Sequence, residues 1–311
     1  MGQLTQHLRG AAVRFAGAGS VNRALRRVAA ARRRDLVLVY HRVVAHPRAP
    51  HEPVPSVAQG MFRRQLEALG EAGKIVALPE LLRDANDGSG VRFAITFDDD
   101  DANHVEHALP VLASMGCPAT FFLSGRCLHN LGGYWWESLE AYVREHGLAA
   151  ARSLTGAPAD SVEELARALQ DRPEAQARLS AAAPRPTAPL RRDELRALSN
   201  AGMTVGFHTV EHQVLTRMDA PSLATALTAG RAELAEVVGQ PLDLFAYPHG
   251  EADARTAAGA RRAGYTAAFT GRDVAVAPGG DRYRIGRWEA GPLEPEALLA
   301  KAVRRLLGGD R

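Results

Sequence analysis

Two short fragments, far apart in the chain, each place metal-binding side chains directly after an apolar run. Asp98 and Asp99 follow the run 93–97, and His208 and His212 follow the run 203–207. Two imidazoles and one carboxylate can hold a divalent cation and leave coordination positions open for water and substrate. Together the two fragments therefore indicate a hydrolytic site.

The two fragments support each other, because each alone is a weak signal. His208 and His212 are four residues apart, and a helical turn would place both imidazoles on one face, although a single H-x-x-x-H is more often a pair of surface histidines. Asp98 and Asp99 repel each other unless a cation lies between them or one takes a proton. With a cation present, one aspartate would bind it and the other would accept a proton from water.

The elements that must position these residues are short apolar runs that alternate with amphipathic stretches. Nearly continuous apolar strands predict a parallel sheet covered on both faces. About seven such units favour an α/β barrel, with a doubly wound open sheet as the alternative. Strands are expected at 36–40, 74–78, 93–97, 119–123, 203–207, 242–247 and 265–269, with a weaker one at 283–285.

Two regions depart from this alternation. Residues 1–34 contain eight arginines and no acidic residue, and we expect a basic N-terminal extension ahead of a barrel at 35–311. Residues of about 130–189 contain no clear strand, which indicates a helical insertion between two barrel units, closed by the proline-rich segment 184–189. The extension is either a solvated, partly helical arm or an amphipathic helix on an anionic membrane surface.

The composition is that of a globular protein that needs no membrane span. The 311 residues are 46% hydrophobic, and the net charge of +3 comes from the extension. We therefore expect no nucleic-acid binding. Two cysteines make no disulfide framework, and we find no segment like a signal peptide. The expected location is cytoplasmic, at the inner membrane face if the extension binds lipid.

The carboxyl ends of barrel strands bring reactive groups to one rim. We therefore expect His41, after 36–40, and Tyr247, Pro248 and His249, at the end of 242–247, to join the aspartates and histidines there. His41 could instead be a strand-end histidine bonded to backbone. His104 and His107 are spaced for one helix face, and by default we expect both at the surface.

Three motifs, in this order, resemble those of the polysaccharide deacetylase family, also called the NodB-homology group or carbohydrate esterase family 4. The motifs are Thr96-Phe97-Asp98-Asp99, His208-Thr209-x-x-His212 and Phe245-Ala246-Tyr247-Pro248-His249-Gly250. Tyr40-His41-Arg42-Val43 and Trp135-Trp136 are similar to a bacterial branch of the family. The resemblance spans roughly 36–288 and implies a distorted (β/α) barrel that removes acetyl groups from N-acetylated sugars.

The resemblance also implies a role for each site residue. It implies one divalent metal ion, zinc or else nickel, cobalt or manganese, bound by Asp99, His208 and His212, with Asp98 as the general base. A backbone N–H near His249, in the segment with Tyr247 and Pro248, would stabilise the oxyanion. No late Leu-x-His-Asp motif follows Trp288, so His41 is the expected general acid.

The implied substrate is an N-acetylated glycan or its precursor. Two further interpretations stay open on the same scaffold. One is a hydrolase of cyclic amides, and the other is a non-catalytic glycan-binding relative.

The chain departs from the family pattern at three positions. Asp100 stands where glycine is usual, which would strengthen cation binding, shift the base, or mark lost activity. His249 replaces an aromatic residue. Ala246 stands where many members have the arginine that orients the base, so either Arg287 or Arg42 would have to take over that contact.

Overall fold

The computed structural model describes residues 18–46, 52–83, 86–183 and 189–308. Residues 1–17 of the expected extension and residues 184–188 of the expected proline-rich linker lie outside the described residues. Within the described ranges, the helices are all too short or too polar to cross a membrane.

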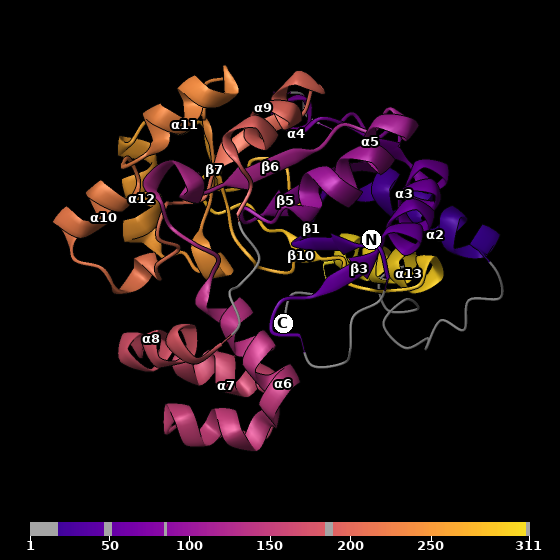
Figure 1. Cartoon of the computed structure of the whole chain (residues 1–311). Helices are drawn as coiled ribbons and strands as arrows, with labels where there is room; N and C mark the ends of the chain where they lie inside the picture. The colour runs from indigo at the N-terminus through magenta and orange to yellow at the C-terminus, as the bar shows by residue number, and fades with distance from the viewer. Residues whose placement is uncertain (1–17, 47–51, 84–85, 184–188, 309–311) are drawn as a thin grey trace.

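The centre of the molecule is one parallel sheet that curls into a distorted (β/α) barrel (Figure 1). Chain order is kept around the sheet from β1 to β9, with no reversal of the kind that defines a doubly wound sheet, and β4 (Lys74–Ile75) pairs with the start of β5. The predicted barrel is thereby confirmed. In spatial order the seven main strands are β10 (Trp288–Glu289), β1 (Leu36–Tyr40), β5 (Arg92–Asp98), β6 (Thr120–Leu123), β7 (Thr204–Phe207), β8 (Leu244–Ala246) and β9 (Ala267–Phe269).

A short segment, 285–289, connects the two edges of this sheet. Ile285 forms a parallel bridge with Phe269 of β9, and Trp288 pairs with Leu38 of β1. The segment therefore crosses from the last strand of the sheet to the first. The strand expected at 283–285 is only this bridge, and the paired residues of β10 come three positions later.

The strands form where the sequence is apolar on both faces, because helices and the barrel interior cover both sides. Every residue of β1 is buried, and so is every residue of β5 after Arg92. Gly206 in β7 allows a close approach to β6, since a Cβ there would lie 2.5 Å from the ring of Phe122. This contact brings β6 and β7 together directly before His208.

Helices surround the sheet, and two small strands lie beside it. The strands are β2 (Arg42–Val44) and β3 (Ser56–Ala58), and the surrounding helices are α2 (Ala18–Arg32), α3 (Gln59–Ala72), α4 (Leu78–Arg83), α5 (Leu109–Met115), α9 (Arg192–Asn200), α10 (Ala220–Ala226), α11 (Arg231–Val238), α12 (Ala254–Arg262) and α13 (Pro295–Leu306).

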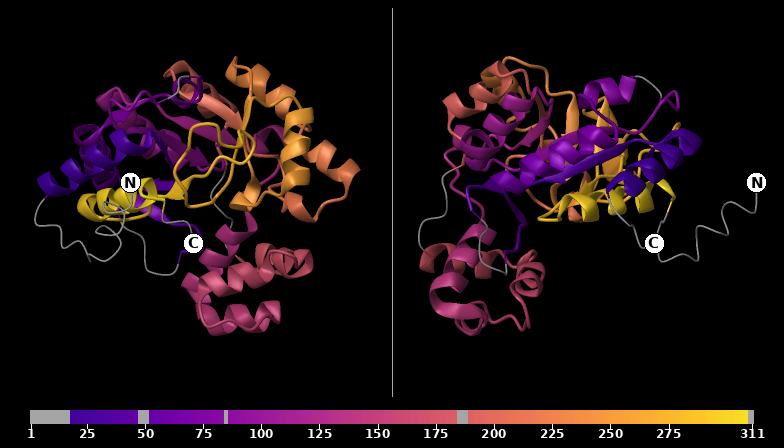
Figure 2. Two further views of the ribbon diagram at one scale, coloured as in Figure 1. Left: turned by 180° about the vertical axis from the view of Figure 1, so that it is seen from behind. Right: turned by 90° about the vertical axis from the view of Figure 1, so that its right-hand side faces the viewer.

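Three helices between β6 and β7 form a separate lobe on one side of the barrel (Figures 1 and 2). They are α6 (Trp135–Thr155), which is interrupted at Gly147, α7 (Val162–Leu169) and α8 (Pro173–Ala182). Their buried leucines, such as Leu139 and Leu165, form an apolar cluster distinct from that of the barrel. We refer to these helices as the helical insertion.

Candidate active site

Strand register brings the candidate residues to one rim. Asp98 is aligned with Phe122 of β6, Leu123 with Phe207 of β7, and Phe207 with Phe245 of β8. Because the paired strands are parallel and end at matching positions, the residues that follow each strand lie at the same edge. The aspartates and His208 therefore lie at the ends of β5 and β7, the two strands that flank β6.

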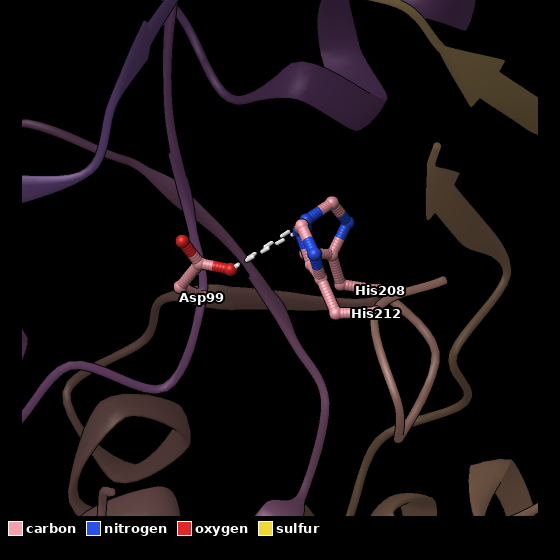
Figure 3. Close-up of side chains that lie close together, drawn as sticks. All are labelled: Asp99, His208 and His212. Carbon is pink, nitrogen blue, oxygen red and sulfur yellow. Dashed lines mark ion pairs between the residues drawn. The ribbon is translucent and has the colours of Figure 1, made fainter. Parts of the chain in front are cut away.

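Asp99, His208 and His212 lie together in space (Figure 3). One donor atom from each lies within 4.8 Å of the other two. His208 Nε2 lies 3.8 Å from Asp99 Oδ1, and His212 Nε2 lies 3.5 Å from the same oxygen. All three donors thus face a common point, which a cation could occupy.

The loop after β7, and not a helical turn, brings the two histidines together. The expected shared helix face is wrong, because residues 208–214 are not helical. Thr209 and His212 have positive φ values of 57° and 54°, and the His212 N–H donates to Thr209 Oγ1. Asp99 and His249 also have positive φ. Non-glycine residues in this conformation concentrate where function requires backbone strain.

The histidines have the protonation state of metal ligands. His208 Nδ1–H donates to the carbonyl of Ala246 at 2.8 Å, which leaves the Nε2 lone pair facing Asp99. Burial lowers the pKa of His208 to about 4 despite the nearby Asp98, and burial lowers the pKa of His212 well below its ordinary value. Both imidazoles are therefore neutral at neutral pH, as metal binding requires.

Asp99 has the environment of a carboxylate that needs a positive charge. Its Oδ1 is buried, and among the described residues no group forms a hydrogen bond with it. Burial raises the pKa of Asp99 to about 7, and Asp98 and Asp100 add to this rise against the opposing effect of His41. A buried oxygen without a partner is costly, and a cation between Asp99 and the two imidazoles would satisfy it. The donor set of two nitrogens and one oxygen fits a zinc-type divalent ion.

Arg287 holds Asp98 in place. Its two terminal nitrogens donate to the two carboxylate oxygens of Asp98, each at 2.6 Å. Burial acts to raise the pKa of Asp98, but Arg287 and His208 outweigh it and hold the value at about 2. Of the two arginines left open by the sequence, Arg287 makes the contact, and it stands immediately before the strand residue Trp288.

Arg42 has a different task, since it connects the barrel to the helical insertion. Its guanidinium lies 2.6 Å from Glu140 and 3.9 Å from Glu137, both on α6, and 3.3 Å from Asp101 on the barrel side. The arginine and its three carboxylate partners are largely buried. This cluster fixes α6 beside the rim.

The carboxylate of Asp100 accepts hydrogen bonds from backbone amides. Its two oxygens accept from the N–H groups of Ser124 and Arg126, each at 2.7 Å, in the loop after β6. The positive φ of this region belongs to Asp99, so position 100 does not need glycine. Asp100 therefore holds the loop after β6, which explains how this aspartate is accommodated beside the site.

His41 lies at the rim after β1 and pairs with Glu289, the last residue of β10. His41 Nδ1 is 2.9 Å from Glu289 Oε2. Burial acts to lower the pKa of His41, but Glu289 raises it to about 9. The imidazole is therefore protonated at neutral pH. The structure favours this ion pair over the simple backbone contact that the sequence left open.

His104 is buried, and the expectation of a surface position is wrong. A π-helix at His104–Ala108 turns its ring into the core, between Phe97 and Phe121. Its Nε2–H donates to the carbonyl of His41 at 2.9 Å. His107 is partly buried. A π-helix changes the helical register locally, so the i, i+3 spacing misassigned the face.

The segment 247–249 is only partly at the site. Tyr247 is buried, and its hydroxyl donates to the carbonyl of Tyr283, while Pro248 is buried in the turn behind it. His249 reaches the rim, where its ring contacts the carbonyl of His212 and the side-chain amide of Gln170 on the helical insertion. His249 thus connects the histidine loop to the insertion.

These groups surround a cavity of about 310 Å³, which we call the catalytic pocket. Its lining also contains Trp135 and Trp136 of α6, which form a wall of the pocket. Trp135 also packs against the apolar cluster of the insertion. The polar lining residues of the pocket include His41, Asp98, Asp99, His208, His212, His249, Arg287 and Glu289. The rim therefore gathers three candidate metal ligands, a fixed carboxylate and a protonated imidazole around one space.

Glu289 and Gln170 were missed by the sequence analysis. Glu289 follows the rule that found the other residues, since it lies at the end of a parallel strand, but the strand has two residues and gives no apolar run. Gln170 has no signal in the sequence, because it reaches His249 from the turn between α7 and α8.

A family model described as polysaccharide deacetylase matches residues 85–268, more than half of the chain. A search of curated proteins gave no match. The chain is similar to the deacetylase PplD from Streptococcus pyogenes, with a TM-score of 0.60, 17% identity and coverage of 88% of this chain and 99% of that one. It is also similar to IcaB from Ammonifex degensii, with a TM-score of 0.55, 21% identity and coverage of 87% and 97%.

At these identities the structural likeness shows the shared fold, and the family model adds the match in sequence. The matched residues contain Asp98, Asp99, His208 and His212. The chain belongs to the polysaccharide deacetylase family.

Proposed function

We propose that this protein is a metal-dependent hydrolase that removes N-acetyl groups from a sugar or polysaccharide. The observation that carries the proposal is the convergence of Asp99, His208 and His212 on one point, beside an aspartate that Arg287 holds ionised. Neutral imidazoles and a buried, unpartnered carboxylate oxygen fit a divalent cation, zinc or else nickel, cobalt or manganese. Bound there, the cation would supply Lewis-acid activation of water and of the acetyl carbonyl.

Asp98 is the proposed general base. Arg287 fixes the plane of its carboxylate, and the low pKa keeps it ionised at any working pH. Its Oδ2 lies 4.0 Å from His208 Nε2, so a water between the ligand cluster and Asp98 is within reach of a hydrogen bond. Asp98 would take the proton of that water as it attacks the acetyl carbon.

His41 is the proposed general acid. It lines the catalytic pocket together with Asp98 and Asp99, and Glu289 keeps it protonated at neutral pH. When the tetrahedral intermediate collapses, the sugar amine needs a proton before it can leave. A protonated imidazole on a different strand from the base can supply it. The backbone N–H near His249 is the proposed donor to the oxyanion.

Acetate release, measured together with metal content, tests the proposal. We expect the purified protein to release acetate from N-acetylglucosamine oligomers. Asp98→Asn should lower kcat by about 10²–10⁴ while the metal stays bound, and His208→Ala should lose metal and activity together. Asp160→Asn, at an exposed position outside the pocket, is the matched control and should change neither.

Three results would contradict the proposal. Full metal content in His208→Ala would remove the ligand assignment. Undiminished turnover in Asp98→Asn would remove the base. Hydrolysis of a cyclic amide without any acetate release would assign a different reaction to the same rim.

A further inference from the structure

A second cavity adjoins the catalytic pocket and has no part in the chemistry described above. It measures about 510 Å³, and we call it the insertion pocket. The two pockets share Trp135, Trp136, Gln170, His212 and His249 in their linings. A ligand in the catalytic pocket can therefore extend directly into the insertion pocket.

One face of α8 forms a wall of the insertion pocket. The residues on this face follow the spacing i, i+3, i+4, i+7 and are Pro173, Gln176, Ala177 and Ser180. The opposite side of the helix buries Ala175 and Leu179 in the core of the helical insertion. An amphipathic helix usually turns a large polar face to water, but here Ala177 and Ser180 are small and leave room against the loop 211–218.

The charges in this lining balance. Arg217 pairs with Asp171 across the pocket, between the barrel loop and the turn before α8. The guanidinium of Arg126 donates hydrogen bonds to the backbone carbonyls of Gly132 and Val210. The lining has two arginines and two acidic residues, the second being the exposed Glu211. An uncharged ligand fits such a pocket better than an anionic or cationic polymer.

The remaining groups suit sugar rings. Trp135 is partly exposed where the two pockets meet, and its neighbour Trp136 stacks on Tyr134 at 4.3 Å between ring centroids. This packing holds a rigid aromatic surface for the apolar face of a sugar. Gln176 donates to the backbone carbonyls of Leu169 and Gln170. These bonds orient its side chain, and its amide oxygen can accept from a hydroxyl group.

We propose that the insertion pocket binds the sugar units next to the acetylated unit, so that the protein acts on a glycan chain in preference to a free sugar. The inference rests on the proposed function, because the acetylated unit must occupy the catalytic pocket. The helical insertion thereby selects the length of the substrate, and the barrel performs the reaction.

A pair of substitutions on α8 tests the inference. Ala177→Trp fills the insertion pocket, whereas Ala181→Trp places the same side chain on the same helix at an exposed position outside the lining. We expect the wild-type protein to have a higher kcat/KM for N-acetylglucosamine pentamers, in two different glycosidic linkages, than for the monomer. Ala177→Trp should lower the ratio of pentamer to monomer kcat/KM by about tenfold or more, and Ala181→Trp should leave it unchanged.

Three outcomes would overturn the inference. They are an unchanged ratio in Ala177→Trp, an equal fall of the ratio in both variants, and a wild-type protein that acts equally well on monomer and pentamer. Circular dichroism and thermal unfolding of the two variants show whether both remain folded. A variant of Ser180, Ser180→Phe, fills the same pocket from the next turn and should repeat the effect of Ala177→Trp.

Calorimetric binding of the same pentamers separates this inference from the proposed function. If the wild-type protein binds the pentamer without releasing acetate, and only Ala177→Trp weakens that binding, the proposed function is wrong. The assignment of the insertion pocket as a glycan-binding site is then still supported. If the protein releases acetate from the monomer, shows no preference for the pentamer and does not bind it, the assignment of the insertion pocket is wrong. The proposed function is supported in that case.

Discussion

The barrel and the helical insertion are held together in different ways. The barrel has a continuous apolar core in which strand residues such as Phe97 and Phe207 are completely buried. The insertion has its own small cluster of leucines and alanines. Its described contacts with the rim include polar pairs, formed by Arg42 with Glu140, Arg217 with Asp171, and Gln170 with His249.

This difference separates two tasks. The proposed catalytic groups come from strand ends and strand-end loops of the barrel, where register and close packing fix their positions. The insertion contributes Trp135, Gln170 and the face of α8, which line the space that a substrate enters. Because the reacting groups lie on the rigid barrel, the residues of the attached lobe can change without disturbing those groups.

The largest expected effect comes from the buried contact between the two regions. Arg42→Met removes the buried cation that Glu140, Glu137 and Asp101 share, and we expect the free energy of unfolding to fall by about 3–5 kcal/mol. Hydrogen exchange should increase first in the insertion, while β5 to β8 stay protected. Chemical denaturation combined with hydrogen-exchange mass spectrometry measures both effects.

Arg144→Met is the matched control for this prediction. Arg144 lies 3.8 Å from the same Glu140, but its side chain is 65% exposed. We expect a change within about 0.5 kcal/mol. Equal destabilisation by the two substitutions would show that burial of Arg42 does not hold the insertion to the barrel.

A smaller effect, confined to the barrel, is expected at Glu289. Glu289→Gln removes the charge that raises the pKa of His41, so the pKa should fall to its ordinary range or below. At about pH 8, kcat should then drop by about tenfold or more, because fewer molecules hold a protonated His41. The pH profile of kcat and the NMR titration of His41 measure this change, and a titration that does not move would exclude Glu289 as the cause.

The same pair has a defined effect on stability. The folded-state pKa of His41, about 9, lies above the ordinary value near 6.5. The pair therefore stabilises the fold fully below that ordinary value, and this contribution is lost as the pH rises through about 9. In Glu289→Gln this pH-dependent loss of stability, as the pH rises through about 9, should disappear. Thermal unfolding across the pH range can check this.

The smallest effect is expected for the exposed contact between the two regions. Asp171→Asn breaks the pair with Arg217, in which both side chains are about half exposed or more. Exposed pairs contribute little, so the free energy of unfolding should change by about 1 kcal/mol or less. A loss as large as that of Arg42→Met would show that the insertion depends on its exposed contacts.

Much of the site could be predicted because barrel chemistry follows strand ends. The runs before Asp98 and His208 are apolar on both faces, which predicts a buried parallel strand before each residue. Residues that follow such strands are expected at the rim of the barrel. The strand that ends at Glu289 has only two residues, and apolar periodicity cannot detect it. His104 was misassigned for a related reason, since its spacing fits an α-helix and the π-helix that turns it inward depends on packing against Phe97 and Phe121.

The sequence by itself determined the barrel class, the family resemblance, and the order in which aspartates and histidines reach one rim. These properties depend on local apolar patterning and on motifs, and both can be identified in the sequence. Only the tertiary structure decided that Arg287 and not Arg42 holds Asp98, that Asp100 binds backbone amides, and that α8 faces the catalytic rim. Those choices depend on which surfaces meet after the strands have paired, and residues about 190 positions apart in the chain, such as Asp98 and Arg287, meet only through that packing.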